Sequence, residues 1–93
     1  MDERDRIYRV LIDAIQIQIS GYVNWDRHRN IPNHIEHREA FLNALHGLLL
    51  FGKNAFAEDR NRLLEAAFEF KTENWWVKKL PKFEEYRNYF LSL

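Results

Sequence analysis

Apolar residues recur with helical spacing from the first turns of the chain. Between residues 3 and 20 they fall three and four positions apart, on a stripe that includes Leu11 and Ile15. This spacing is typical of a helix with one buried face. Asp2 is placed to cap the start of this helix and Gly21 to end it, since glycine readily takes the conformation that follows a helix.

The next stretch is less regular. The alternation of isoleucine and glutamine before Gly21 also suits a strand, so a strand over residues 15–23 stays open as an alternative. Residues 21–32 have no sustained period, and Pro32 disfavours a helical Ile31. We expect a long loop here, and its aromatic residues should fold back onto the helices.

The pattern then becomes apolar on nearly every helical face. Asn33 is placed to cap a helix over residues 34–52, and Gly52 to end it. A helix that is apolar all round is usually buried on several sides, so this second helix should be the central one, unless it buries a face in a partner. A smooth strip that would let another helix approach closely is formed by Ala40, Ala44 and Gly47.

The remaining segments are also helical in pattern. We expect a helix over residues 55–72, a short helical turn over residues 75–80 that Pro81 ends, and a last helix over residues 82–92. The predicted fold class is all-α: a compact bundle of four helices plus a short fifth helical segment, forming one domain over residues 1–93.

Composition narrows the classes of protein. The 93 residues are 46% hydrophobic and contain no cysteine, which excludes disulfides, thiolate metal sites and a cysteine nucleophile. Fourteen basic and fourteen acidic residues cancel, so nothing draws the whole chain to nucleic acid or to an anionic membrane. With a charged N-terminus and no long apolar run, we expect a cytoplasmic protein that is not bound to a membrane.

One short motif carries candidate chemistry. The run Arg-Asn-Ile-Pro-Asn-His over residues 29–34 resembles the signature of the HEPN superfamily, in which His follows Arg after four to six residues. Members are helical bundles that often act as dimeric, metal-independent RNases. The resemblance implies that Arg29 would stabilise phosphate charge, that His34 would handle the 2'-hydroxyl proton, and that Asn30 would support them. The enzyme assignment is therefore an alternative to a binding role, and we lean towards a protein that is not an enzyme.

No other catalytic or cofactor pattern is present. His28, His34 and His37 lie close in sequence, but His46 points away from them on a regular helix and no third ligand converges. The glycines are too far apart for a phosphate-binding loop. We expect neither a metal nor a cofactor.

A surplus of aromatic residues favours a protein partner. Trp, Tyr and Arg dominate the residues that contribute most to binding at interfaces. We therefore predict a small protein-binding module of the inhibitor, immunity-protein, antitoxin or adaptor type. A homodimer, and weak nucleic-acid binding by the Trp- and Lys-rich C-terminal segment, are further possibilities, although nucleic acid is the less favoured partner. The expected contact residues are Tyr22, Trp25, Arg27, Arg29, Trp75 and Trp76.

Overall fold

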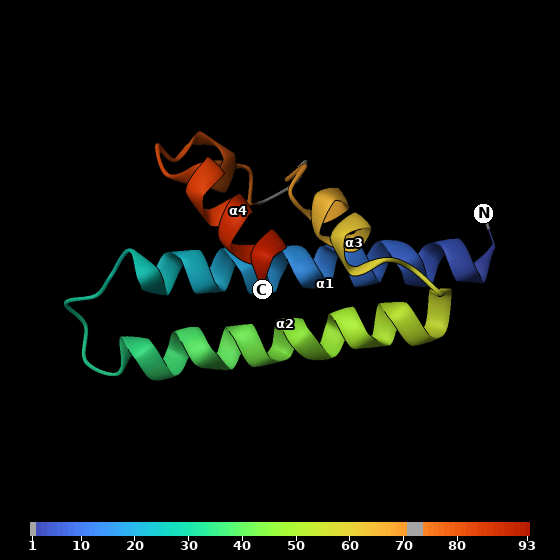
Figure 1. Cartoon of the computed structure of the whole chain (residues 1–93), viewed down its shortest axis with the longest axis horizontal. Helices are drawn as coiled ribbons and strands as arrows, with labels where there is room; N and C mark the ends of the chain where they lie inside the picture. Colours follow the sequence, from blue (N-terminus) through green and yellow to red (C-terminus); the bar gives the residue numbers. More distant parts are fainter. Residues whose placement is uncertain (1, 71–73) are drawn as a thin grey trace.

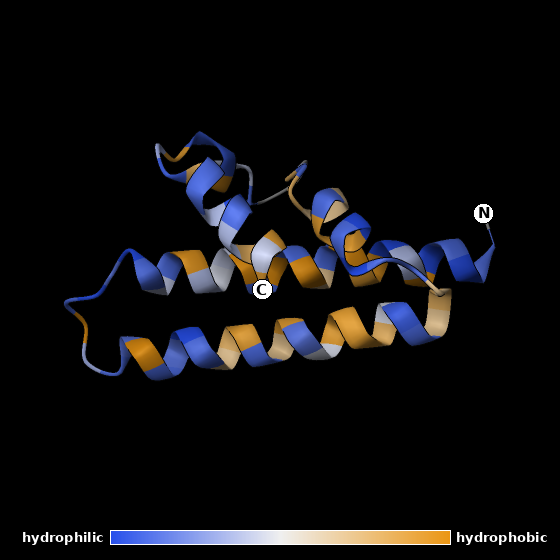
Figure 2. Cartoon of the chain, in the orientation of Figure 1, coloured by the Kyte–Doolittle hydropathy of each residue, from blue (hydrophilic) through white to orange (hydrophobic). Residues whose placement is uncertain are grey.

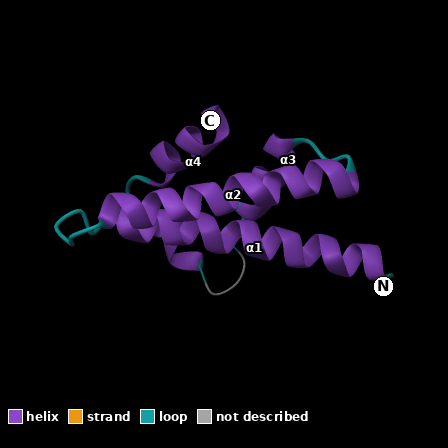
Figure 3. Cartoon of the chain, turned by 90° about the horizontal axis from the view of Figure 1, so that it is seen from below, coloured by secondary structure: helices purple, strands orange, loops and turns teal. Residues whose placement is uncertain are grey.

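The computed structural model describes residues 2–70 and 74–93, and these residues form helices joined by short connections (Figure 1). Four α-helices and one 3-10 segment occur in the described residues, without a strand, so the predicted all-α class is confirmed (Figure 3). In chain order they are α1 (Glu3–Asp26), α2 (His34–Phe56), α3 (Arg60–Ala67), η1 (Trp75–Lys79) and α4 (Phe83–Ser92). No helix of the described part of the chain is both long and apolar enough to cross a membrane.

Helix α1 is the central element. It packs against α2 along its length, while α3 and α4 lie on its other side (Figure 1). Of its two buried polar residues, Ser20 is satisfied within the helix, where its hydroxyl donates to the Gln16 carbonyl oxygen at 2.9 Å, whereas the buried Gln16 Nε2 has no hydrogen-bond partner among the described residues. Each core side chain is at most 5% exposed: Leu11, Ile15, Ile19 and Val23 of α1, Leu45 and Leu49 of α2, Leu63, Leu64 and Ala67 of α3, and Phe68, Phe70, Val77 and Phe90.

The expectation that the second helix is central was wrong. Only one side of α2 is buried, while Leu50 and Phe51 are 59% and 48% exposed and the strip of Ala40, Ala44 and Gly47 faces outward. Apolar residues do recur around α2 (Figure 2), but the short α3 and α4 segments lie against α1 and leave much of α2 uncovered.

Two glycines that were expected to end helices lie inside them. Helix α1 continues through Gly21 to Asp26, which also rules out a strand over residues 15–23 and shortens the predicted loop. A Cβ atom on Gly21 would lie 2.2 Å from the Phe41 ring of α2. Gly52 is likewise buried inside α2, where a Cβ would lie 2.6 Å from Leu63. These residues are glycines because neighbouring helices come too close for a side chain.

The third helix is shorter than expected. Ala57 takes a left-handed conformation and ends α2, and the Asp59 side chain accepts a hydrogen bond from the Asn61 N–H to begin α3. The helix ends at Ala67, although the buried Phe70 that follows belongs to the core. Residues 71–72, the expected helix end, lie outside the described residues.

We predict that Gly21→Ala destabilises the protein, whereas Gly47→Ala does not. The new methyl group at residue 21 would overlap the Phe41 ring, at a cost of about 1–3 kcal/mol. No atom lies within 4 Å of a Cβ at Gly47, so alanine there should gain up to about 1 kcal/mol in helix propensity. Urea unfolding of the two variants measures the difference, and equal stabilities would contradict the close helix approach.

A candidate anion-binding cavity at the end of α1

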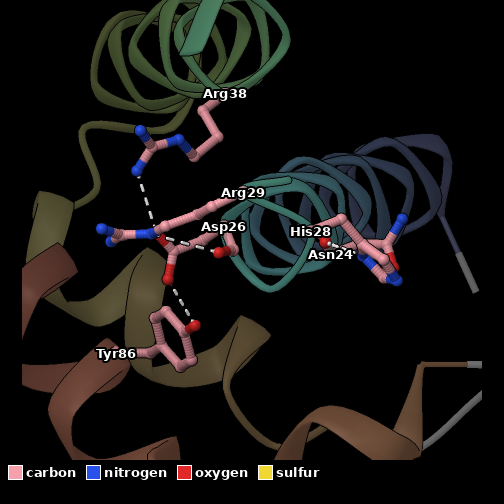
Figure 4. Close-up of polar contacts among 6 residues, drawn as sticks. All are labelled: Asn24, Asp26, His28, Arg29, Arg38 and Tyr86. Carbon is pink, nitrogen blue, oxygen red and sulfur yellow. Dashed lines mark hydrogen bonds and ion pairs between the residues drawn. The ribbon is translucent and has the colours of Figure 1, made fainter. Parts of the chain in front are cut away.

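Three elements meet at the carboxylate of Asp26, the last residue of α1 (Figure 4). Its Oδ1 accepts hydrogen bonds from Arg29 at 2.7 Å and from Arg38 of α2 at 2.8 Å. Its Oδ2 accepts one from the Tyr86 hydroxyl of α4 at 2.6 Å. The Asp26 side chain is 15% exposed, so one carboxylate ties together the ends of α1 and α2 and the first turn of α4.

These contacts keep Asp26 ionised. Partial burial alone would raise the carboxyl pKa, but the hydrogen bonds from Tyr86 and Arg29 and the charges of Arg29 and Arg38 outweigh it, so the pKa lies below its usual value. Burial and the bond to Asp26 in turn raise the pKa of the Tyr86 hydroxyl, which therefore stays protonated as a donor.

A cavity of about 610 Å³ opens beside this cluster. Arg27, Arg29 and Lys82 supply three positive charges to its lining, and Asp26 supplies the one carboxylate. Because Arg29 and Asp26 pair with each other, the excess positive charge of the cavity comes from Arg27 and Lys82. Leu80 and Pro81 add an apolar wall. This combination suits a ligand that has a negative group attached to an apolar part.

Aromatic residues of η1 adjoin the cavity. The guanidinium of Arg27 lies 5.7 Å from the centre of the Trp76 ring, and the Lys79 ammonium lies 5.1 Å from that of Trp75. Trp75 is 55% exposed. Arg27 and Trp76 therefore form a mixed cationic and aromatic surface at the cavity, and Lys79 and Trp75 form a second such pair on η1. A cation already covers one face of each tryptophan ring, which leaves less ring surface for stacking against nucleic-acid bases.

The structure gives the six predicted contact residues different roles. Arg27 and Arg29 line the cavity, Trp76 lies against Arg27, and Trp75 pairs with Lys79 on the η1 segment. Tyr22 is instead half-buried against α4. Its ring stacks on Tyr89 at 5.6 Å and meets Phe90 edge-on, and burial together with the Tyr89 hydrogen bond raises the pKa of Tyr22 to about 12.

Trp25 is also occupied within the chain. Its ring stacks on the His37 ring of α2, with the ring centres 4.1 Å apart. This contact holds together the ends of the α1–α2 pair. Neither Tyr22 nor Trp25 lines the cavity.

The HEPN-like pair is not gathered into the cavity. Arg29 lies in the turn after α1, where Asp26 binds its guanidinium, and it lines the cavity. His34 is the first residue of α2 and is absent from that lining; its buried Nδ1 has no hydrogen-bond partner among the described residues. The supporting Asn30 is exposed in the turn.

The histidines do not form a metal site. His28 Nδ1 lies 2.6 Å from the Asn24 carbonyl oxygen, on the opposite side of α1 from Tyr86 (Figure 4), and His37 stacks on Trp25. Within residues 2–70 and 74–93 no group of three or more potential metal ligands converges.

Sequence reasoning missed the central residue of the cluster. Asp26 was not singled out because it lies in residues 21–32, which were expected to be a loop, where side-chain spacing carries little information. Arg38 lies in the predicted second helix, and its pairing with Asp26, 12 residues away, leaves no local spacing signal. The spacing of Asp26 and Arg29 is that of neighbours on one helical turn. That spacing would have indicated an ion pair if α1 had been expected to continue.

Comparisons with protein-family models, with curated proteins and with solved structures found no match for this chain. The function proposed below therefore rests on the fold and on the cavity.

We predict that Asp26→Asn destabilises the protein by about 2 kcal/mol near neutral pH, since an amide leaves two arginines without their carboxylate. The folded-state pKa of Asp26 is lowered, so its contribution is fully present above the ordinary value of 3.8 and is lost as pH falls through the lowered pKa. The difference in unfolding free energy between the unaltered protein and the Asp26→Asn variant should therefore become smaller in acid. Asp13→Asn, at an exposed position of α1, is the matched control. Urea unfolding at neutral and acidic pH measures both, and equal effects of the two variants would contradict the central role of Asp26.

Proposed function

We propose that this protein is a small protein-binding module that captures an acidic segment of a partner protein at the end of α1. The observation that carries the proposal is the cavity lined by three cationic side chains and one carboxylate: Arg29 pairs with Asp26, and the charges of Arg27 and Lys82 remain in excess. Inhibitory, immunity, antitoxin and adaptor functions are all consistent with a helical module of this kind.

The rigid support of the cavity favours binding. Asp26 holds Arg29 in place through one charged hydrogen bond, so part of the entropy cost of ordering that side chain is met before the partner arrives. Arg27 rests against Trp76 in the same way. Preordered arginines can bind a carboxylate through two parallel hydrogen bonds, which gives directional recognition.

The surroundings favour a protein over a lone small anion. Leu80 and Pro81 form an apolar wall, and the exposed Trp75 lies on the adjoining η1 segment. Tryptophan and arginine are the residue types that most often dominate protein interfaces. A partner segment could place an acidic side chain against the cationic lining of the cavity. The apolar residues next to that side chain would then pack against Leu80, Pro81 and η1.

We predict that a hexaglutamate peptide binds at the cavity and that Lys82→Glu weakens this binding by about tenfold or more, because the variant adds repulsion where the lining supplies attraction. Lys53→Glu, with the same change of charge near the opposite end of the α1–α2 pair, should bind as the unaltered protein does (Figure 1). NMR titration of backbone amides measures affinity and place together, with the largest shifts expected at Arg27, Arg29, Leu80 and Lys82. Shifts elsewhere, or equal losses in the two variants, would contradict the proposed site.

The natural partner can be sought with the same variants. The unaltered protein and the Lys53→Glu variant should capture one common partner from cell lysate, while Lys82→Glu should lose it. A partner retained equally by all three proteins would show that the cavity is not the binding surface. Binding of single-stranded DNA in place of hexaglutamate would favour the nucleic-acid alternative.

A further inference from the structure

Arg29 keeps hydrogen-bond donors for a ligand although Asp26 holds it. A guanidinium carries five N–H donors. The Arg29 Nε donates to the Asp26 carbonyl oxygen at 3.3 Å, and its Nη2 donates to the Asp26 carboxylate at 2.7 Å (Figure 4). The Arg29 Nη1 makes no hydrogen bond with another described residue. This side of the guanidinium can therefore donate to a ligand in the cavity.

Arg27 and Lys82 carry the charge that the chain itself does not neutralise. Arg27 rests on the Trp76 ring, and neither its guanidinium nor the Lys82 ammonium forms a hydrogen bond or an ion pair within the described part of the chain. Arg27 follows α1 and Lys82 precedes α4, yet both line the same cavity. The cavity thus offers two unneutralised positive charges to one ligand.

Two positive charges match one phosphate monoester. A phosphorylated side chain carries about −1.5 to −2 charges near neutral pH and presents three strong acceptor oxygens. A carboxylate carries one charge on two oxygens, so it would leave one of the two cations without a counter-charge. A phosphate of a nucleic-acid backbone is a diester and also carries a single charge. The charge of the lining therefore favours a monoester over both.

The apolar wall distinguishes among phosphate monoesters. Leu80 and Pro81 directly precede Lys82 along the chain, so the wall adjoins one of the two cations. A phosphotyrosine has an aromatic ring next to its phosphate, and the ring would pack on this wall while the phosphate meets the cations. A phosphoserine has only one methylene group in that place. The volume of about 610 Å³ is also within the range of small-ligand pockets, roughly 300–1,000 Å³.

We propose that the acidic group captured by the cavity is a phosphotyrosine of the partner protein. This inference rests on the proposed function, because it takes the cavity to be the site that binds the partner's acidic segment. Arg27 and Lys82 balance the two charges of the phosphate, and the Nη1 of Arg29 adds a hydrogen bond. Leu80 and Pro81 pack against the ring. Phosphorylation of the partner therefore strengthens its binding to this protein.

Two small probes of the same shape test the charge match. Phenyl phosphate and phenyl sulfate share a ring, but only the phosphate carries a second charge. At about pH 7.5, NMR titration should show that phenyl phosphate binds about fivefold or more tightly than phenyl sulfate. At about pH 5 the phosphate has taken up a proton, so the preference should disappear. Equal affinities at the higher pH would overturn the proposal.

A matched pair of variants assigns the preference to its cations. Arg27→Gln removes one of the two excess charges, so its affinity for phenyl phosphate should fall close to that for phenyl sulfate. Arg9→Gln, at an exposed position of α1 outside the cavity lining, should keep the full preference. The amide spectra show whether each variant is folded. A preference that survives in Arg27→Gln would overturn the assignment of the second charge.

Peptides identify the carrier of the phosphate. A short alanine-based peptide with one phosphotyrosine should bind more tightly than the same peptide with phosphoserine, glutamate or unmodified tyrosine, and more tightly than adenosine monophosphate. Equal binding of the phosphoserine peptide would overturn the role of the wall. Tighter binding of adenosine monophosphate would overturn the assignment to a protein partner.

Hexaglutamate separates this inference from the function on which it rests. If hexaglutamate shifts the amides of the cavity while the phosphotyrosine peptide binds no better than the glutamate peptide, the inference is wrong and the proposed function stands. If neither hexaglutamate nor the phosphotyrosine peptide shifts those amides, both are wrong.

Discussion

The close approach of neighbouring helices at two glycines is the constraint on which this structure depends. At Gly21 the ring of Phe41 occupies the space of a side chain, and at Gly52 the side chain of Leu63 does so. The first contact brings α2 against α1, and the second seats α3 against α2 beside Leu11. A side chain at either position would push the helices apart and open the core that they share.

The path of α1 then determines the candidate site. Because the helix continues past Gly21, its last turn reaches α4, and Asp26 can bind both Arg38 and Tyr86. A helix that ended at residue 20 would leave Asp26 in a loop without these partners. The length of the helix thus sets the charge of the cavity: Asp26 pairs with Arg29 of the lining while it holds three elements together, and Arg27 and Lys82 remain as the excess positive charge.

Much of the fold follows from the spacing of apolar residues. That spacing predicted the number and order of the helices, and Asp2 caps α1 as expected by accepting a hydrogen bond from the Asp5 N–H. The glycines misled because glycine serves both to end a helix and to admit a close neighbour, and these roles differ only in what lies opposite in space. The sequence also favoured the second helix as the central one. Gln16 and Ser20 are polar, so α1 looked exposed on that side, yet both residues are buried in the structure.

The candidate site was less predictable than the fold. Arg27, Arg29 and Trp76 were expected to contact a partner and do lie at or beside the cavity, whereas Tyr22 and Trp25 are used within the chain. Aromatic residues look alike in sequence whether they pack inside or outside, so only contacts separate the two groups. The engagement of Asp26 depends on Arg38 and Tyr86, which are 12 and 60 residues away along the chain.

The central claim is that α1 runs unbroken through Gly21 and thereby brings Asp26 to α4. NMR secondary chemical shifts of the Cα and carbonyl carbons across residues 18–27 test it most directly. Helical shifts that continue through Gly21 to Asp26, with slow exchange of the intervening amides, are the predicted result. A loss of helical shifts at Gly21, with fast exchange beyond it, would contradict this account of both the fold and the cavity.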